Sequence, residues 1–320
     1  MRHDGPDVVA PALAARGTGV VSAVVISYQS ECTITACIKG LIGGGVDTVT
    51  VVDNSIDDAT EHAVLSMPES STGQISYHRL TNVGYARAVN YGVRESRPAQ
   101  WLVVANADVE LRSSLDRLIA VLEAHEAAMV SGLLSGVETN IRPKVTPLRE
   151  LYRAVAGDRR AYGRLRGQVR GPHPVPQLDG ALLVMPTDIF EALEGFDERF
   201  ELYYEDVDLC VRSLPFGGCW LVPEVVGHHI GGSSTTVNRA PSFAAMRVSR
   251  LRYARKHWGR GGVALVVLAG VLETCTRSIA SCSEGWEGRK LAISAQVGEL
   301  KEPGVVWLFP GNRQMDREDT

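Results

Sequence analysis

Residues 20–27 read VVSAVVIS, a run of apolar and mostly β-branched side chains interrupted only by serine. Because both alternating sets of side chains are largely apolar, this run predicts a strand covered on its two faces, as in a parallel sheet. A helical pattern over 31–41 follows and ends at the glycines 43–45, and a second apolar run comes at 48–52. Short strands that alternate with helices predict an α/β fold built from βαβ units.

Polar side chains follow several of the predicted strands directly. Ser27 ends the first strand, Asp53 follows the second, and Asn106 follows an apolar run at 101–105, after a third short strand at 75–78. The carboxyl ends of parallel strands meet at one edge of a sheet, where open α/β sheets bind ligands. We therefore expect a binding site at this edge.

Later segments continue the alternation. Residues 115–125 have the apolar spacing of an amphipathic helix, and LDGALLVM at 178–185 predicts another strand. Pro186 then suits the start of a helix that runs to Leu193.

The composition is that of an ordinary globular protein. The 320 residues are 45% hydrophobic and 22% charged, and the net charge of −4 gives no reason to expect nucleic acid as a partner. The six cysteines form no CxxC pair and no metal-ligand spacing, so we expect reduced thiols in a cytoplasmic protein. The apolar, uncharged run at 261–272 falls short of the roughly 20 residues of a spanning helix, so we expect no membrane crossing.

Three regions differ in pattern. Residues 1–19 hold charges, two prolines and no apolar run, which predicts a flexible tail and no secretory signal. The strands and helices of 20–240 are expected to form one α/β domain, and 241–320 a helical C-terminal extension.

The segment 142–176 is a basic excursion from that domain. Nine arginines and lysines between residues 142 and 170 stand against two acids, Glu150 and Asp158. Two interpretations are open: a solvated part of the chain, or an acceptor loop that meets an anionic group such as a phosphate.

One helical face is visible in the C-terminal extension. It consists of apolar residues spaced 4, 3, 3 and 4 apart: Ala244, Val248, Leu251, Ala254 and Trp258. Basic residues crowd around this face: Arg247, Arg250, Arg252, Arg255, Lys256 and Arg260. The face predicts core packing or a homodimer contact, or else an interfacial helix on an anionic membrane.

Five sequence motifs carry most of the remaining chemistry. They are VVISYQS at 24–30, VVDNSIDD at 51–58, NVGYARAVNYG at 82–92, NAD at 106–108, and EDVD at 205–208 paired with HHIGGSS at 228–234. Each also fits a local structural role: Asp53 can close an Asx turn, and the acids of EDVD can complement the dipole of a helix start.

Taken in order, these motifs resemble the glycosyltransferase family 2 enzymes of the GT-A fold, especially the rhamnosyltransferase-like branch, over about residues 21–234. The resemblance implies a Rossmann-like mixed sheet flanked by helices. It also implies a bacterial-type enzyme that transfers a sugar, with inversion, from a nucleotide diphosphate donor, with dTDP-L-rhamnose as a candidate. The acceptor would be a hydroxyl of a glycan, a glycolipid or a natural product.

The resemblance also assigns roles to residues. Asp206 would be the catalytic base that removes the proton of the acceptor hydroxyl. Asp108 and His229 would hold Mg²⁺ or Mn²⁺ at the departing diphosphate, with His228 as the alternative to His229. The residues implied to bind the nucleotide and the donor sugar are Ser27, Tyr28, Asp53, Asn82, Gly84, Asn106, Asp179, Gly180 and Glu205.

One departure from the family pattern bears on the metal. Asn106 stands where a DxD-type motif has its first acid, which leaves Asp108 as the one sure carboxylate of NAD. This loss favours a rival function, a nucleotide-sugar-binding protein without activity, whereas the intact Glu205-Asp206 pair argues against it. A second rival, a sugar nucleotidyltransferase, would need a phosphate loop rich in Gly and Arg or Lys after the first strand, where this chain has SYQSE.

A lipid-linked acceptor would place the enzyme in the cytoplasm at the inner face of the membrane.

Overall fold

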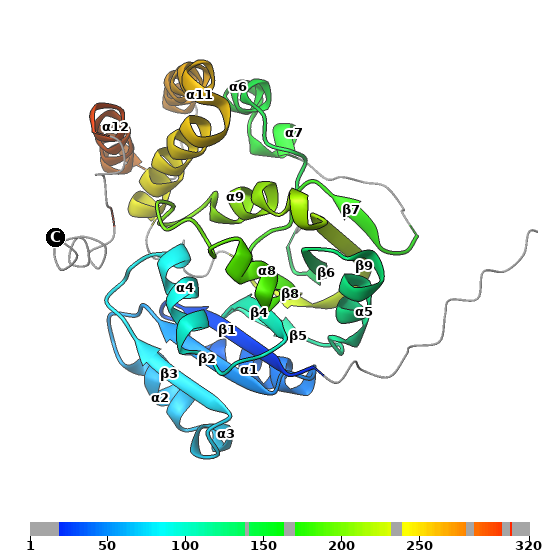
Figure 1. Ribbon diagram of the computed structural model, residues 1–320. Helices are drawn as coiled ribbons and strands as arrows, with labels where there is room; N and C mark the ends of the chain where they lie inside the picture. The colour runs from blue at the N-terminus through cyan, green and yellow to red at the C-terminus, as the bar shows by residue number, and fades with distance from the viewer. Residues whose placement is uncertain are drawn as a thin grey trace, which may run out of the picture.

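The computed structural model describes residues 19–137, 141–162, 170–231, 239–279, 285–302 and 308. Within these residues one nine-stranded mixed sheet runs through the molecule in the order β3-β2-β1-β4-β8-β6-β9-β5, and β7 pairs with β9 (Figure 1). The expected tail at 1–19 lies outside the described residues, except for Gly19.

Four parallel strands form one half of the sheet. They are β1 (Val21–Ser27), β2 (Thr48–Asp53), β3 (Ile75–Arg79) and β4 (Trp101–Asn106). All seven residues of β1 are buried. The apolar runs predicted at 20–27, 48–52, 75–78 and 101–105 are therefore confirmed as strands.

The other half of the sheet is mixed. β8 (Leu182–Pro186) runs antiparallel to β4, and β6 (Met129–Ser135) runs antiparallel to β8 and parallel to β9 (Cys219–His229). The short strands β5 (Val109–Leu111) and β7 (His173–Val175) both pair antiparallel with β9. The strand expected at 178–185 begins four residues later than predicted.

Helices cover the sheet and enclose two apolar cores. The helices that contribute core residues on one face are α1 (Ile34–Gly43), α2 (Ala59–Leu65) and α5 (Asp116–His125), and those on the other face are α4 (Tyr85–Glu95), α8 (Thr187–Ala192) and α9 (Glu205–Arg212). A short α3 (Pro68–Ser71) and the 3₁₀ turn η1 (Leu214–Phe216) complete this part. The expected mixed α/β sheet flanked by helices is confirmed.

The basic excursion is partly helical. It contains α6 (Pro147–Ala156) and α7 (Asp158–Tyr162), and α6 packs against the C-terminal helix α11. Arg153 of α6 is buried, so this arginine is not solvated. Arg164 and Arg166 lie outside the described residues.

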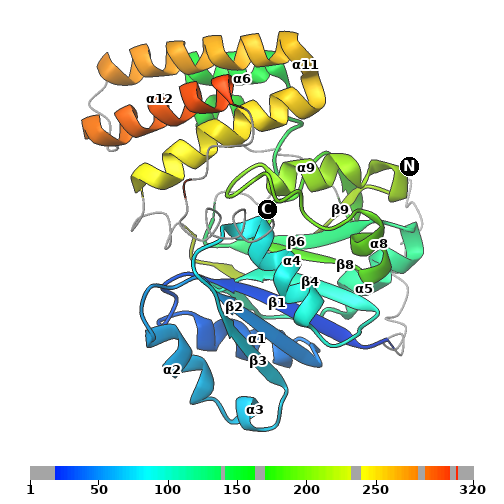
Figure 2. The same ribbon diagram turned by 60° about the vertical axis from the view of Figure 1, so that its left-hand side comes forward.

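The described residues of the C-terminal extension are mainly helical. Helix α11 (Arg239–Ile279) is broken by a non-helical residue at Gly259, so its second half turns back along the first, and α12 (Gly285–Lys301) packs beside it (Figure 2). The predicted apolar face is buried from Ala244 to Ala254, which confirms core packing. Among the described residues no helix is long and apolar enough to span a bilayer.

The arginines around that face are not presented to solvent. Arg247, Arg250 and Arg252 are buried. Arg252 Nη2 lies 3.0 Å from Glu299 of α12. These three arginines are therefore unavailable to an anionic membrane, and that part of the interfacial-helix prediction is wrong.

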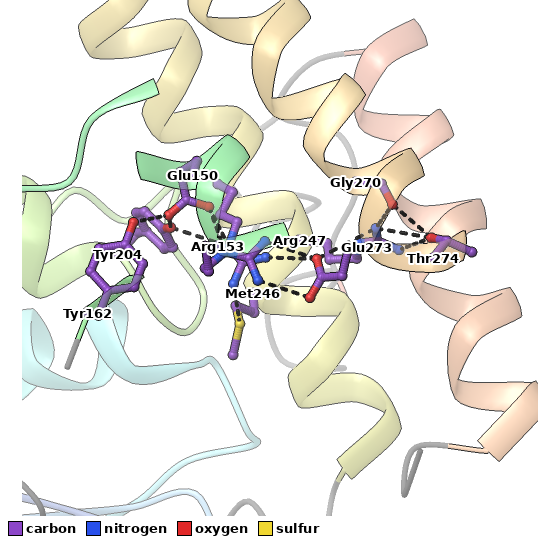
Figure 3. A network of polar contacts seen from close by, with 10 residues as sticks. Glu150, Arg153, Tyr162, Tyr204, Met246, Arg247, Gly270, Glu273 and Thr274 are labelled. Carbon is purple, nitrogen blue, oxygen red and sulfur yellow. Dashed lines mark hydrogen bonds and ion pairs between the residues drawn. The ribbon is translucent and has the colours of Figure 1, made fainter. Parts of the chain in front are cut away.

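A buried ionic cluster joins α6 to α11 (Figure 3). Arg153 places both terminal nitrogens 3.0 Å from the carboxylate of Glu273 and its Nε 3.0 Å from Glu150. Arg250 Nη1 lies 3.3 Å from Glu273 and Arg250 Nε 3.4 Å from Glu150. Tyr204, directly before α9, donates its hydroxyl to Glu150 at 2.9 Å, so the cluster also reaches the helices that pack on the sheet.

Candidate active site

The carboxyl edge of the parallel strands gathers the predicted residues. Ser27 pairs with Asp53 across β1 and β2, and Asn106 pairs with Ile26 across β4 and β1. The placement expected from the strand pattern is therefore confirmed. Ser27 is buried, and its hydroxyl has no hydrogen-bond partner among the described residues. Tyr28 follows in a half-buried position.

Asp53 is fully buried and makes hydrogen bonds within the protein. Its Oδ1 accepts from the backbone N–H of Ser55 at 3.2 Å and from the Ser55 hydroxyl at 2.6 Å, while Oδ2 accepts from Tyr77 at 2.6 Å. The contact to the Ser55 N–H is the Asx turn that the motif allowed. Contact of Asp53 with a nucleotide base stays a prediction.

The loop at 82–84 needs glycine because of the protein's own backbone. Gly84 has φ of 80°, and a Cβ there would lie 2.4 Å from the carbonyl oxygen of Glu201. Asn82 Oδ1 accepts from the Gly84 N–H at 3.0 Å, and Asn54 Nδ2 donates to the Gly84 carbonyl at 3.3 Å. The next residue, Tyr85, donates its N–H to Glu201 at 2.7 Å, so this loop joins two distant parts of the chain.

Asp108 and His229 face each other. Val109 pairs with His229 across β5 and β9, which places His229 Nε2 3.2 Å from Asp108 Oδ1. Asp108 Oδ2 accepts from the N–H of Gly231 at 3.1 Å. His228 instead lies 3.1 Å from the hydroxyl of Ser135, so the geometry favours His229 over His228. Gly232 and the two serines of HHIGGSS lie outside the described residues.

This pair fits part of a divalent-metal site. Among the described residues no group of three His, Cys, Asp or Glu side chains can hold an ion. Two neighbouring ligands of an octahedral ion at about 2.1 Å would lie about 3 Å apart, close to the 3.2 Å between Asp108 Oδ1 and His229 Nε2. A carboxylate oxygen suits Mg²⁺ or Mn²⁺, so the two side chains fit as partial ligands.

The acids of EDVD stand at the start of α9, after a strained turn. Tyr203 and Tyr204 have φ of 66° and 70°, in the left-handed region that non-glycine residues rarely adopt. Such strain persists only where surrounding contacts hold it. Tyr204 meets that condition through Glu150 and through Arg250 Nε, which donates to its hydroxyl at 3.2 Å.

The three acids of EDVD have different surroundings. Asp208 is fully buried among basic side chains, with Arg212 Nε, Lys256 Nζ and His257 Nε2 each 2.7 Å from one of its oxygens. Burial alone would raise the pKa of Asp208, but the hydrogen bonds from His257 and Lys256 and the charge of Arg212 hold it below the ordinary value. Asp208 therefore anchors α9 to α11.

Asp206 points toward the predicted donor-sugar pocket. Its Oδ2 accepts from the N–H of Gly180 at 3.1 Å and its Oδ1 from the N–H of Val207 at 2.8 Å. Burial and the nearby Asp179 carboxylate raise the pKa of Asp206 to about 6, while Arg142 acts to lower it. Arg142 itself lies 3.5 Å from Asp179. A pKa near the working pH suits a general base.

Glu205 is more deeply buried than Asp206. Its Oε2 has no hydrogen-bond partner among the described residues. Burial and the charge of Asp206 raise the pKa of Glu205 well above its ordinary value. The neutral form of Glu205 is therefore favoured beside the ionisable Asp206.

Tyr85 joins the two halves of the site, and the sequence motifs assigned it no role. Its hydroxyl donates to the carbonyl of Gly180 at 2.8 Å. Its pKa is raised well above the ordinary value by burial and then by four acids: Glu205, Asp206, Asp108 and Asp179. Tyr85 thus lies among the predicted base, donor and metal residues, and its place inside NVGYARAVNYG was the available signal.

A backbone bond adds a second connection. The N–H of Asn106 donates to the carbonyl of Ala181 at 3.0 Å, and Ala181 follows the glycine that contacts Asp206. The NAD and EDVD motifs, about 100 residues apart in the chain, therefore form one site. The arrangement places an ionisable carboxylate in the same site as an Asp–His pair.

Comparison with known proteins defines the class. The model of Glycosyl transferase family 2 matches residues 22–193, more than half of the chain. The chain belongs to this family, as the motifs predicted.

Characterised relatives are distant. A low-salt glycan biosynthesis hexosyltransferase, Agl10 of Haloferax volcanii, is 24% identical over 64% of this chain and 66% of the relative, so the chain spans just under two thirds of that protein. An N-acetylglucosaminyl-diphospho-decaprenol L-rhamnosyltransferase of Mycobacterium tuberculosis is 28% identical over 66% of this chain and 76% of the relative.

Solved structures share the fold. The mannosyltransferase PcManGT from Pyrobaculum calidifontis, in complex with GDP-Man and Mn²⁺, superposes with a TM-score of 0.53 at 18% identity, covering 95% of this chain and 86% of the other. GalNAc-T7 with UDP, GalNAc and Mn²⁺ gives a TM-score of 0.51 at 14% identity, covering 88% and 58%. The fold is therefore that of the GT-A glycosyltransferases.

Proposed function

We propose that this transferase moves a sugar from a nucleotide diphosphate donor to an acceptor hydroxyl in one displacement, with inversion at the sugar carbon. The observation that carries the proposal is the Asp206 carboxylate, held by the N–H of Gly180 in the same site as Asp108 and His229. Inversion needs one base on the face opposite the leaving group, and Asp206 supplies one carboxylate with a pKa of about 6.

The chain's residues divide the work in this proposal. Asp206 removes the proton of the acceptor hydroxyl as its oxygen attacks the sugar carbon. Gly180 orients that carboxylate, and Tyr85 fixes the carbonyl of Gly180. The predicted donor residues Ser27, Tyr28, Asp53, Asn82, Asn106, Asp179 and Glu205 would surround the nucleotide and the sugar.

A divalent ion is part of the proposal. Asp108 and His229 would hold Mn²⁺ or Mg²⁺ together with the donor diphosphate and water, and the Mn²⁺ in the solved mannosyltransferase supports this assignment. When bound, the ion would stabilise the negative charge that develops on the departing diphosphate. Asn106 would add a neutral oxygen in place of a second carboxylate.

The donor and acceptor are proposed from the relatives. The rhamnosyltransferase relative supports an L-rhamnosyl donor such as dTDP-L-rhamnose, and the diphospho-decaprenol in its name supports a hydroxyl on a lipid-linked sugar as the acceptor. The hexosyltransferase relative is a reason to test other hexosyl donors as well.

A donor screen tests the proposal. The full chain is incubated with Mn²⁺ and each of a set of nucleotide sugars, and free nucleoside diphosphate is measured while a thermal-shift assay reports binding. We expect one donor to raise the melting temperature and to be slowly hydrolysed without acceptor. Binding without hydrolysis or transfer would support the non-catalytic rival, and release of pyrophosphate from a sugar phosphate and a nucleoside triphosphate would support a nucleotidyltransferase.

A further inference from the structure

Three helical segments form the end of the molecule farthest from β1, β2 and β3. They are α6, the part of α11 after Gly259, and α12, here called the outer helices. Figures 1 and 2 both show them together above the sheet, and α11 packs against both α6 and α12. The surface of the outer helices is thus one end of the protein.

The exposed side chains of α6 are all apolar. Leu148, Tyr152 and Val155 are 73%, 53% and 64% exposed. Their spacing of four and three residues places them on one face of the helix. Of the charged residues between them, Glu150 and Arg153 are buried and Arg149 is half-buried.

The other outer helices repeat this pattern. In α11 the exposed non-glycine residues of 261–274 are Ala264, Leu268 and Val271, again spaced four and three apart. In α12 the exposed residues of 291–300 are Leu291, Ile293, Ser294, Val297 and Leu300. None of the exposed residues in α6 or in these two stretches is charged. Single exposed apolar residues are ordinary on a protein surface, but a charge-free face shared by three adjacent helices is not.

The charges of this region lie inside. The buried charged residues contributed by α6, α11 and α12 are Glu150, Arg153, Arg247, Arg250, Arg252, Glu273 and Glu299. A helix that packs on a protein core in water normally shows the opposite arrangement, with apolar residues inside and charges outside. This reversed arrangement of charged and apolar side chains indicates that the outward face of the helices meets an apolar medium.

Basic residues border the exposed apolar faces along the chain. The exposed basic residues that flank these faces in the sequence are Lys144, Arg160, Arg260, Lys290 and Lys301. Among the nearest flanking residues that the structure describes, the one exposed acid is Glu302. Apolar residues bordered by lysine and arginine are typical of helices that lie in the interface of an anionic membrane.

We propose that the outer helices dip into one leaflet of an anionic membrane, with the apolar faces among the acyl chains and the flanking basic residues at the headgroups. A second copy of this chain fits less well. A two-fold contact through this face would bring like-charged basic borders toward each other. The proposal concerns where the protein binds and is independent of the proposed reaction.

The residues involved differ from those expected from the sequence. The basic helix predicted to bind lipid has three of its arginines buried in ion pairs. In the present proposal the exposed apolar residues of the outer helices contact the membrane instead. Binding through charge alone is lost when salt screens it, whereas apolar burial resists salt. Salt dependence therefore separates the two modes.

Vesicle flotation of the full chain tests the proposal, with vesicles of phosphatidylethanolamine and phosphatidylglycerol. We expect the wild type to float with the vesicles, and to remain partly bound at about 1 M NaCl, where the Debye length is about 3 Å. Leu268→Asp and Leu148→Asp, on separate helices, should each weaken binding by about tenfold, since an acid is placed among acyl chains. Leu65→Asp on α2 is the matched control, because the exposure of Leu65 (54%) lies between those of Leu268 (47%) and Leu148 (73%); this variant should bind as the wild type does.

Three outcomes would overturn the proposal: a wild type that stays with the unbound protein at low salt, binding that vanishes entirely at high salt, or a control that loses binding as strongly as the two test variants. A dimer in light scattering that Leu268→Asp separates would assign the face to a second copy instead. Circular dichroism of each variant verifies folding, and these substitutions replace only exposed side chains.

Discussion

Replacing Glu273 by glutamine is expected to destabilise the C-terminal helices strongly. Glu273 is the acid shared by Arg153, Arg250 and Arg247, at 3.0, 3.3 and 3.8 Å (Figure 3). With Glu150, the cluster holds three cations and two acids, a net charge of +1. Glutamine keeps the shape of the side chain but leaves three buried guanidinium groups with one acid, a net charge of +2.

The magnitude follows from burial. Each of these side chains is less than a tenth exposed, so solvent screening is weak. Removing one partner from a buried ion pair costs about 3–5 kcal/mol, because the remaining charge stays desolvated. For a domain of this size such a loss lowers the melting temperature by roughly 5–10 °C.

Thermal and urea unfolding of Glu273→Gln measure this effect. The control is Glu61→Gln, which breaks the Arg79–Glu61 pair at 3.4 Å, where both side chains are about one third exposed. An exposed pair contributes about 1 kcal/mol or less. Equal, small changes in both variants would refute the conclusion that the buried cluster holds α6 and α11 together.

Three further predictions concern the site. Because Asp206 must be ionised to act as a base, kcat/KM should fall as pH drops through about 6. Asp179→Asn should move this inflection to lower pH and Arg142→Gln should move it to higher pH. A pH profile unchanged in both variants would contradict the conclusion that these two charges set the pKa of Asp206. Asp108→Ala and an excess of chelator should each abolish most turnover, whereas full activity in chelator would remove the metal from the mechanism. Gly84→Ala should lower the free energy of unfolding by about 1–3 kcal/mol, because φ there is left-handed and the new Cβ would lie 2.4 Å from Glu201. The control is Gly43→Ala, where a Cβ would have nothing within 4 Å, and it should not destabilise the protein.

The parallel half of the sheet was predictable because its signal is local. Four apolar runs correspond to β1, β2, β3 and β4 to within a residue or two, since strands covered on both faces need continuous apolar sequence. β6 was not predicted, because Ser131 and Gly132 interrupt its run. Gly132 is there for a distant reason: a Cβ would lie 2.3 Å from Val226 of β9.

The site was predictable where motifs carry it and not where long-range contacts do. The family resemblance selected Asp108, His229 and Asp206. In the structure Asp108 faces His229, and the adjacent residues Gly180 and Ala181 link Asp206 to Asn106. Arg153 and Asp208 pair with residues 120 and 49 positions away in the chain. The residue types alone therefore gave no sign that these two side chains are buried. The same long-range pairing made the basic excursion and the basic helix look solvent-facing.

Turnover of Asp206→Asn tests the central claim most directly. Asparagine keeps the shape of the side chain but cannot take the proton, so kcat should fall about 10²–10⁴-fold while the affinity for the donor, measured by calorimetry, stays near that of the wild type. Glu205→Gln and Asp208→Asn, with folding verified by circular dichroism, should reduce kcat less or act through stability. Near-wild-type turnover of Asp206→Asn would contradict the proposed inverting mechanism, and loss of turnover only in Asp208→Asn would show that the base had been assigned to the wrong acid of the motif.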